Sequence, residues 1–276
     1  MGTIKFNIDK IAEYLDSQKK NLEGNWNKSS MLKSSVLEKL GKFLSGSELE
    51  QLRKAENRFL QEVELKKLLE KKIAEFRKND KVKYGQLCLW IIQDWGGIVS
   101  RNDNATSIVE LIDGFYDRKH LYRISSTSKV ASFEYPKEHL IYDSRVAYSL
   151  NWIILSQNAG DKFFPIPSGR NSKMRAFDLN ALIRLENICK YIPKNRQELE
   201  NKKFINEIDK ELYIAEDKAY SELRDLIIAV NKKLWKDDNV RMENLYYTEM
   251  LLFAMADREI YDDIVKSVKL TINHNG

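Results

Sequence analysis

Lys129 and Asp143 are residues of complementary chemistry that lie on either side of Pro136, near the middle of the chain. A lysine amine that burial or cationic neighbours keep neutral is a nucleophile, whereas a rigidly held carboxylate stabilises developing positive charge or orients a water molecule. The sequence predicts a short helix over residues 129–133 with its flanks and a second helix over residues 144–157, which Asp143 caps. Two residues of complementary chemistry are therefore expected close to one bend of the chain.

The segments around this pair carry groups that suit a phosphate backbone. Hydroxyl residues at 125–128 open the first helix, where free amides and hydroxyls together form a ready site for a phosphate oxygen. Basic residues outnumber acidic ones over residues 117–129 and 161–175, whereas residues 243–263 are acidic. This distribution predicts one basic face that could hold nucleic acid. The predicted contacts are Arg118, Arg123, Ser125, Ser126, Thr127, Ser128, Arg145, Arg170 and Lys173.

Amphipathic helices must position these groups. The chain has only four prolines and eleven glycines, and apolar residues recur three and four positions apart over long stretches. Ser47 with Glu50 predicts a capping box that opens one long helix reaching about Lys78. The lysine-rich part of that helix, residues 64–83, is interpreted as a solvated helix face. The expected fold class is all-α.

Composition narrows the class of protein further. A chain of 276 residues that is 43% hydrophobic can bury a substantial core. It contains no run of eighteen apolar residues, so we expect neither a membrane span nor an export signal, and a cytoplasmic location. Cys88 and Cys189 lie in apolar helical patterns and are expected in the core. The histidines lack ligand spacing and no phosphate-binding glycine motif occurs, so no metal and no cofactor are expected.

The residues around the pair resemble the helix-hairpin-helix DNA glycosylase superfamily, in particular divergent bacterial members similar to 8-oxoguanine DNA glycosylase. In that superfamily a hairpin precedes a helix of pattern G-x-K-x-A, whose lysine is the nucleophile of the bifunctional members. An aspartate then opens the next helix in V-D-x-H. The corresponding segments of this sequence are S-K-V-A at residues 128–131 and I-Y-D-S-R-V at residues 141–146. The resemblance is close around these motifs and looser over residues 84–190.

The chain departs from the family pattern at several positions. LYRISSTS stands where the family has a glycine-rich hairpin, and Arg145 stands where the family has a histidine. The lysine and the aspartate are 14 positions apart, which is closer than in the familiar enzymes. The cysteine cluster of the iron–sulfur members does not occur in the sequence.

The resemblance implies a two-lobed helical fold with the active cleft between the lobes. Residues 1–80 would form an N-terminal helical region and residues 81–190 the glycosylase-like core with its divergent hairpin. Residues 191–276 would form a C-terminal helical region that packs with the N-terminal part.

The resemblance also implies an activity, the excision of a damaged or modified base from DNA by cleavage of its N-glycosidic bond. Asp143 would stabilise the oxocarbenium-like sugar or orient water, and Lys129 would attack the sugar carbon and add AP lyase activity. The partner would be double-stranded DNA with a flipped base, bound by a monomer, with modified phage DNA as one source. The predicted base pocket consists of Trp95, Trp152, Phe163 and Phe164.

Structural roles remain open for each of these residues. Asp143 could serve only as an N-cap, Lys129 as a phosphate contact, and Arg145 as the partner of a carboxylate. Tryptophans on apolar helices are more often core than pocket. The alternative function is a non-catalytic helical protein that keeps a glycosylase-like fold and binds nucleic acid or another protein.

Overall fold

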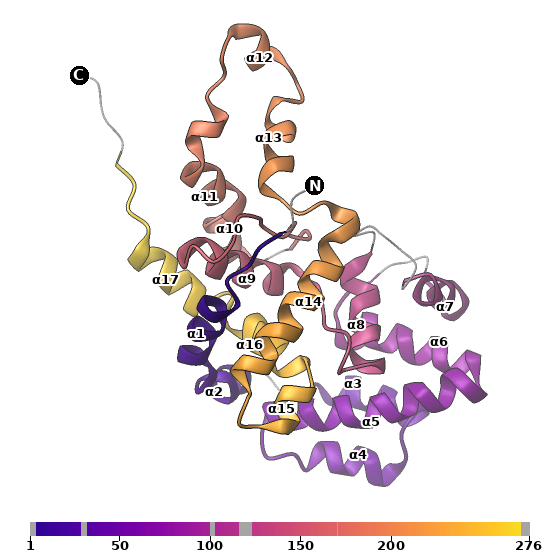
Figure 1. Cartoon of the computed structure of the whole chain (residues 1–276). Coiled ribbons are helices and arrows are strands. Elements are labelled where there is room, and N and C mark those ends of the chain that lie inside the picture. The colour runs from indigo at the N-terminus through magenta and orange to yellow at the C-terminus, as the bar shows by residue number, and fades with distance from the viewer. Residues whose placement is uncertain (1–3, 29–31, 100–102, 116–122, 170, 272–276) are drawn as a thin grey trace.

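The chain is all-helical in the computed structural model, which describes residues 4–28, 32–99, 103–115, 123–169 and 171–271 (Figure 1). Within those ranges extended backbone pairs only as two isolated bridges, Phe6 with Gly160 and Phe163 with Tyr213. The prediction of an all-α chain is therefore confirmed for these residues. None of their helices is long and apolar enough to cross a bilayer.

One cluster of buried apolar side chains, here called core A, joins helices from residues 34–113. Leu69, Ile73, Leu87 and Ile112 are fully buried within it, because each lies on the apolar stripe of its amphipathic helix. The elements of core A are α3 (Ser34–Lys39), η1 (Leu40–Lys42), α4 (Gly46–Arg53), α5 (Arg58–Asn79), α6 (Lys81–Leu89), the π-helical turn η2 (Trp90–Trp95) and α7 (Ala105–Asp113).

A second cluster, here called core B, joins the two ends of the chain. Helix α1 packs against α14, and α2 packs against α16. The main elements of core B are α1 (Ile8–Lys19), α2 (Leu22–Asn27), α9 (Ser144–Ser156), α11 (Leu179–Glu186), α14 (Glu216–Leu234), α16 (Tyr246–Met255) and α17 (Glu259–Ser267). Shorter elements connect them: α10 (Ser172–Ala176), η3 (Ile188–Tyr191), α12 (Arg196–Glu200), α13 (Phe204–Leu212) and α15 (Asn239–Glu243), with α12 at the end of an arm that extends from the body (Figure 1).

Two helices supply side chains to both clusters. In α5, Phe59 and Val63 belong to core B, whereas the following turns belong to core A. In α8 (Ile124–Glu134), Ala131 belongs to core B, whereas Val130 and Phe133 belong to core A. Helices α5 and α8 also pack against each other. They therefore form a seam between the two cores, and Lys129 lies on it.

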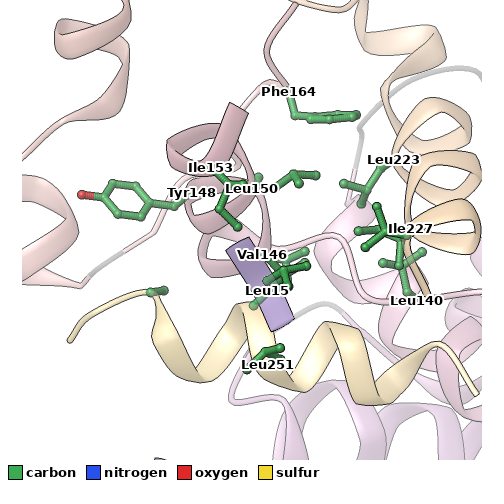
Figure 2. Packing of buried hydrophobic residues seen from close by; sticks show 14 of the residues in the cluster. Leu15, Leu140, Val146, Tyr148, Leu150, Ile153, Phe164, Leu223, Ile227 and Leu251 are labelled. Atoms are coloured by element: carbon green, nitrogen blue, oxygen red, sulfur yellow. The ribbon is translucent and has the colours of Figure 1, made fainter. Parts of the chain in front are cut away.

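Helix α9 is the centre of core B and carries Asp143 at its head. Val146, Leu150 and Ile153 recur four and three positions apart, so they form one stripe, and all three are fully buried. Figure 2 shows this stripe surrounded by side chains that include Leu223 of α14 and Leu251 of α16. Because helices from both ends of the chain enclose it, α9 is a rigid support for its N-cap.

Several sequence-based predictions of local structure are wrong. The capping box pairs Ser45 with Glu48 instead of Ser47 with Glu50, and it opens α4, which is separate from α5. Asn57 caps the second of these helices, so the single long helix that the sequence predicts is two separate helices. Cys88 is buried as expected, but Cys189 is exposed, and the short η3 turn that carries it has no buried residue.

Candidate functional site

Asp143 is held rigidly at the N-terminus of α9. Its Oδ1 accepts hydrogen bonds from the backbone N–H groups of Arg145 at 3.0 Å and Val146 at 3.1 Å. These two amides have no partner inside the helix, so the side chain satisfies them as an N-cap does. The predicted capping role is confirmed. Since one carboxylate oxygen makes both bonds, the other oxygen, Oδ2, is directed elsewhere.

Lys129 reaches that second oxygen from a different helix. Its Nζ lies 3.5 Å from Asp143 Oδ2, and the two side chains are 8% and 13% exposed. The distance is at the long limit of a hydrogen bond, so the contact is a loose ion pair. Lys129 sits in the middle of α8 and not near its start, as the sequence had suggested, because the helix begins at Ile124. A partly buried ion pair adds little to stability, since desolvation offsets the attraction.

Gly96 lies against the side chain of Lys129. It follows the π-helical turn η2, and a Cβ placed on it would lie 2.8 Å from the Cδ of Lys129 and 2.8 Å from the backbone oxygen of Ile92. The lysine stem therefore passes directly over a backbone position that lacks a side chain. Turns of π-helix are rare and occur often at functional sites.

Replacing Gly96 with alanine is expected to lower the free energy of unfolding by about 1–3 kcal/mol, the usual cost of overpacking. The new methyl group would meet backbone oxygens, which cannot rotate away as a flexible side chain can. Urea unfolding measures the change. Gly24→Ala is the matched control, because a Cβ there meets no heavy atom within 4 Å. A Gly96→Ala variant as stable as the parent would contradict this packing.

The hydroxyls predicted to bind phosphate are used inside the protein. Ser126, Thr127 and Ser128 are buried, and Ser128 Oγ donates to the carbonyl of Ile124 while accepting from the N–H of Tyr142. Thr127 Oγ1 bonds carbonyls of the preceding turn. Ser125, which is half-buried, donates to the Tyr142 carbonyl. These expectations are corrected: α8 starts earlier than predicted, so its hydroxyls face the core and fix the chain before Asp143.

The basic residues that were predicted to contact the phosphate backbone differ from one another in their surroundings. Arg123, whose φ of 54° is left-handed, forms a two-bond pair with Asp103 at 2.8 and 2.5 Å. Arg145 pairs with Asp257 at 3.3 Å and lies over the ring of Phe253, so its alternative role as a carboxylate partner is confirmed. Lys173 is exposed in the first turn of α10. Arg118 and Arg170 lie outside the described residues.

Three of the four aromatic residues predicted for a base pocket are core residues. Phe164 is fully buried and stacks on Phe6 with ring centroids 5.5 Å apart, and Phe163 is buried beside Tyr213. Trp152 is buried and donates from Nε1 to Asp263 at 2.7 Å. These predictions are corrected: Trp152 lies on α9, Phe163 and Phe164 lie in the segment that follows it, and all three belong to core B.

Trp95 differs from them because it lies next to Gly96 at the seam. Its ring packs edge-on against Phe133, with centroids 4.9 Å apart, and its Nε1 donates to Glu62 at 3.0 Å. Glu62 is fully buried and forms an ion pair with Arg58 at 2.7 Å. Trp95 is half-buried and directly precedes Gly96, over which the Lys129 stem passes.

Sequence reasoning missed several buried charged residues. Among them are Glu62, Lys66 and Glu249, which are 0%, 2% and 2% exposed. Lys66 lies in the segment interpreted as a solvated face, and this interpretation is wrong for it. A signal was present, because Glu62 and Lys66 follow the spacing of Phe59 and Val63, and Glu249 interrupts an otherwise apolar helix. Charged residues on an apolar stripe are a reason to expect a buried polar cluster.

Two recesses lie at the two ends of helix α9. A recess of about 210 Å³ lies beside the N-terminus of α9, where Ser144, Tyr148, Ile166 and Met174 contribute to its wall. A wider groove of about 1100 Å³ lies at the other end of α9, near Asn158. In the described part of the chain no three His, Cys, Asp or Glu side chains are grouped as metal ligands would be.

Comparison of the chain with protein-family models, with curated proteins and with solved structures finds no match in any of the three.

Proposed function

We propose that the protein is a DNA N-glycosylase that excises a damaged or modified base, with Asp143 and Lys129 as its catalytic residues. The observation that carries the proposal is the Lys129 Nζ to Asp143 Oδ2 distance of 3.5 Å between two partly buried groups from different helices. In a glycosylase of the helix-hairpin-helix type, a lysine and an aspartate would share one site. Such an ion pair contributes little to the free energy of unfolding, so stability alone does not account for the placement of these two residues.

The chemistry follows from charge on the sugar. When the N-glycosidic bond breaks, its electron pair leaves with the base, and positive charge develops at the sugar carbon and ring oxygen. The Oδ2 atom of Asp143 would face that charge while the N-cap bonds to Oδ1 hold the carboxylate in place. In the hydrolytic route, water adds to the carbon and gives its proton to Asp143.

In the lyase route, the amine of Lys129 replaces water. Transfer of an ammonium proton to Asp143 frees the nitrogen lone pair, which adds to the sugar carbon as the base leaves. The amine then gives a second proton to the sugar ring oxygen as the bond between that oxygen and the sugar carbon breaks, which leaves a protonated Schiff base. The Schiff base permits strand cleavage and is finally hydrolysed. The base must first rotate out of the duplex into the protein. The resemblance to members acting on modified bases makes modified phage DNA one candidate substrate.

A non-catalytic helical binding protein remains the second candidate. It is favoured by the buried hydroxyls of α8 and by the ion pairs that already occupy Arg123 and Arg145. Such a protein would bind DNA or a protein partner without breaking a bond.

An assay for released bases separates the two candidates. The parent protein is incubated with duplex DNA that contains a panel of oxidised, alkylated and hypermodified bases, and mass spectrometry detects free base while alkali cleavage detects abasic sites. The glycosylase proposal expects release from at least one substrate. DNA binding without release from any member of the panel would favour the second candidate.

A further inference from the structure

The arm of the molecule, defined here as residues 184–211, has almost no core of its own. It comprises the end of α11, then η3, α12 and most of α13, and it extends from the body (Figure 1). Its two limbs join the body where Ile183 and Leu212 enter core B. Between these two positions Phe204 is the only buried residue, in a stretch that the structure describes completely. The outer part of the arm therefore leaves most of its apolar side chains uncovered.

Exposed aliphatic side chains are concentrated on this arm. Thirteen large hydrophobic residues are exposed in the described part of the chain, and five of them lie within residues 185–205. These five are Leu185, Ile188, Ile192, Leu199 and Ile205, of which the middle three are 57%, 66% and 63% exposed. Single exposed apolar residues are ordinary, but a group of them on one projecting element marks an interaction surface.

Polar contacts at the base of the arm hold its two limbs together. Arg184 of α11 donates from Nε at 3.1 Å and from Nη2 at 2.6 Å to the two carboxylate oxygens of Asp209 in α13. The hydroxyl of Tyr191 donates to the same carboxylate at 2.7 Å. Helix α13 also packs against η3. Because a two-bond pair of this kind fixes geometry, the limbs stay side by side and present their aliphatic side chains on a defined element.

The charges of the arm favour a second copy of the same chain over nucleic acid as the partner. Seven basic residues stand against six acidic ones between Arg184 and Glu211. Arg184 already pairs with Asp209 inside the arm, and Arg196 pairs with Glu200 at 2.9 Å. A nucleic-acid surface needs an excess of positive charge, whereas a balanced surface can meet its own copy without net repulsion.

The exposed area suits a contact between two arms. Five aliphatic side chains that are about half exposed present on the order of 400 Å² of apolar surface. Two such surfaces amount to about half of a standard interface of about 1,600 Å², which is close to the apolar share of such interfaces. A two-fold axis brings the same patch of both copies together, so one patch is sufficient for a closed dimer.

We propose that the arm is a dimerisation element, and that two copies of the chain associate arm against arm about a two-fold axis. The aliphatic side chains of residues 185–205 form the centre of this contact, and the charged side chains around them form its rim. This assembly differs from the monomer that the resemblance to DNA glycosylases implies. The inference does not depend on base excision, because the properties of the arm alone carry it.

Sedimentation equilibrium of the whole protein without DNA tests the inference. The parent is compared, over a wide range of concentration, with the double variant Ile192→Lys, Leu199→Lys. Both positions are exposed in the single chain, so the new lysines should not disturb its fold, and far-UV circular dichroism checks this. Val82→Lys is the matched control, because Val82 is 65% exposed in α6, outside the arm.

We expect the parent to reach the mass of two chains. The dissociation constant should rise by about 100-fold or more in the double variant, since each lysine places a charge in an apolar contact. Val82→Lys should dimerise as the parent does. A parent that stays a single chain at every concentration would overturn the inference, even if the double variant then bound DNA more weakly, which would assign the arm to nucleic acid. A dimer that the double variant leaves unchanged would also overturn it.

Cys189 provides a second measurement at a native position. It is exposed and follows Ile188, whereas Cys88, the other cysteine of the chain, is fully buried. Bismaleimides of graded length should therefore link two parent chains through Cys189, as seen by denaturing gel electrophoresis. The link should be lost in Cys189→Ser and in the double variant, and kept in Val82→Lys. A dimer that no bismaleimide links through Cys189 would contradict contact between the arms.

The two proposals fail in different experiments. Both measurements of the arm are made without DNA, so they report on dimerisation whether or not the protein excises a base. Failure of the proposed function appears in the base-release assay, whereas failure of this inference appears in the mass and in the cross-links.

Discussion

Asp143→Asn is expected to slow base release by about 100-fold or more, the usual scale for removing a group that stabilises transition-state charge. Asparagine is also a favoured N-cap, and its side-chain oxygen can accept from the amides of Arg145 and Val146 as Asp143 does. The fold should therefore survive while the negative charge is lost. Single-turnover release of the base from a substrate found in the panel measures the effect.

The matched control for this variant is Asp178→Asn. Asp178 caps α11 by accepting from the N–H of Asn180, it is exposed, and it belongs to neither helix of the seam. The same chemical change at this cap should leave base release unchanged. If Asp143→Asn releases base as fast as the parent, the proposed role of the carboxylate is wrong, and only its capping role remains.

Lys129→Gln is expected to abolish the covalent protein–DNA adduct that borohydride traps on DNA with an abasic site. Reduction fixes a Schiff base only where an amine has attacked the sugar aldehyde carbon, and glutamine has no such amine. The adduct should fall by about 100-fold or more, and a far-UV circular dichroism spectrum like that of the parent shows that the variant is folded. Gel electrophoresis after reduction measures the adduct.

The control for this variant is Lys202→Gln, which removes an exposed lysine between α12 and α13. It should leave the adduct at the level of the parent. Persistence of the adduct in Lys129→Gln would show that another amine attacks the sugar. A parent that releases base without forming any adduct would show that water, and not Lys129, is the nucleophile, with Asp143 acting alone.

The local features of the candidate pair were predictable because they depend on near neighbours. An aspartate before an apolar stripe at helical spacing predicts an N-cap, and Asp143 is one. The pattern around Cys88 likewise predicted a buried residue. The start of α8 was misjudged, since no capping side chain marks it and Arg123 adopts a left-handed conformation there.

The seam itself could not be predicted, since it depends on contacts between distant segments. Nothing near Lys66 in the chain shows that its ammonium meets Phe133, 67 positions later, or Tyr246 of α16. The sequence predicts that this part of α5 is a lysine-rich, solvent-exposed face. In the folded chain, α8 and α16 cover one side of it. For the same reason, the predicted pocket residues Trp152 and Phe164 became core residues once the ends of the chain packed around α9.

The sequence alone therefore determined the all-helical character, the cap at Asp143 and the order of the lysine and the aspartate along the chain. Helix periodicity and capping act over a few residues, so they can be seen in the sequence itself. Tertiary structure decided that Lys129 meets Asp143, that the hydroxyls of α8 turn inward, and that Glu249 and Lys66 are buried. Those outcomes depend on which helix faces pack together, and packing between segments far apart in the chain is fixed only when the whole core forms.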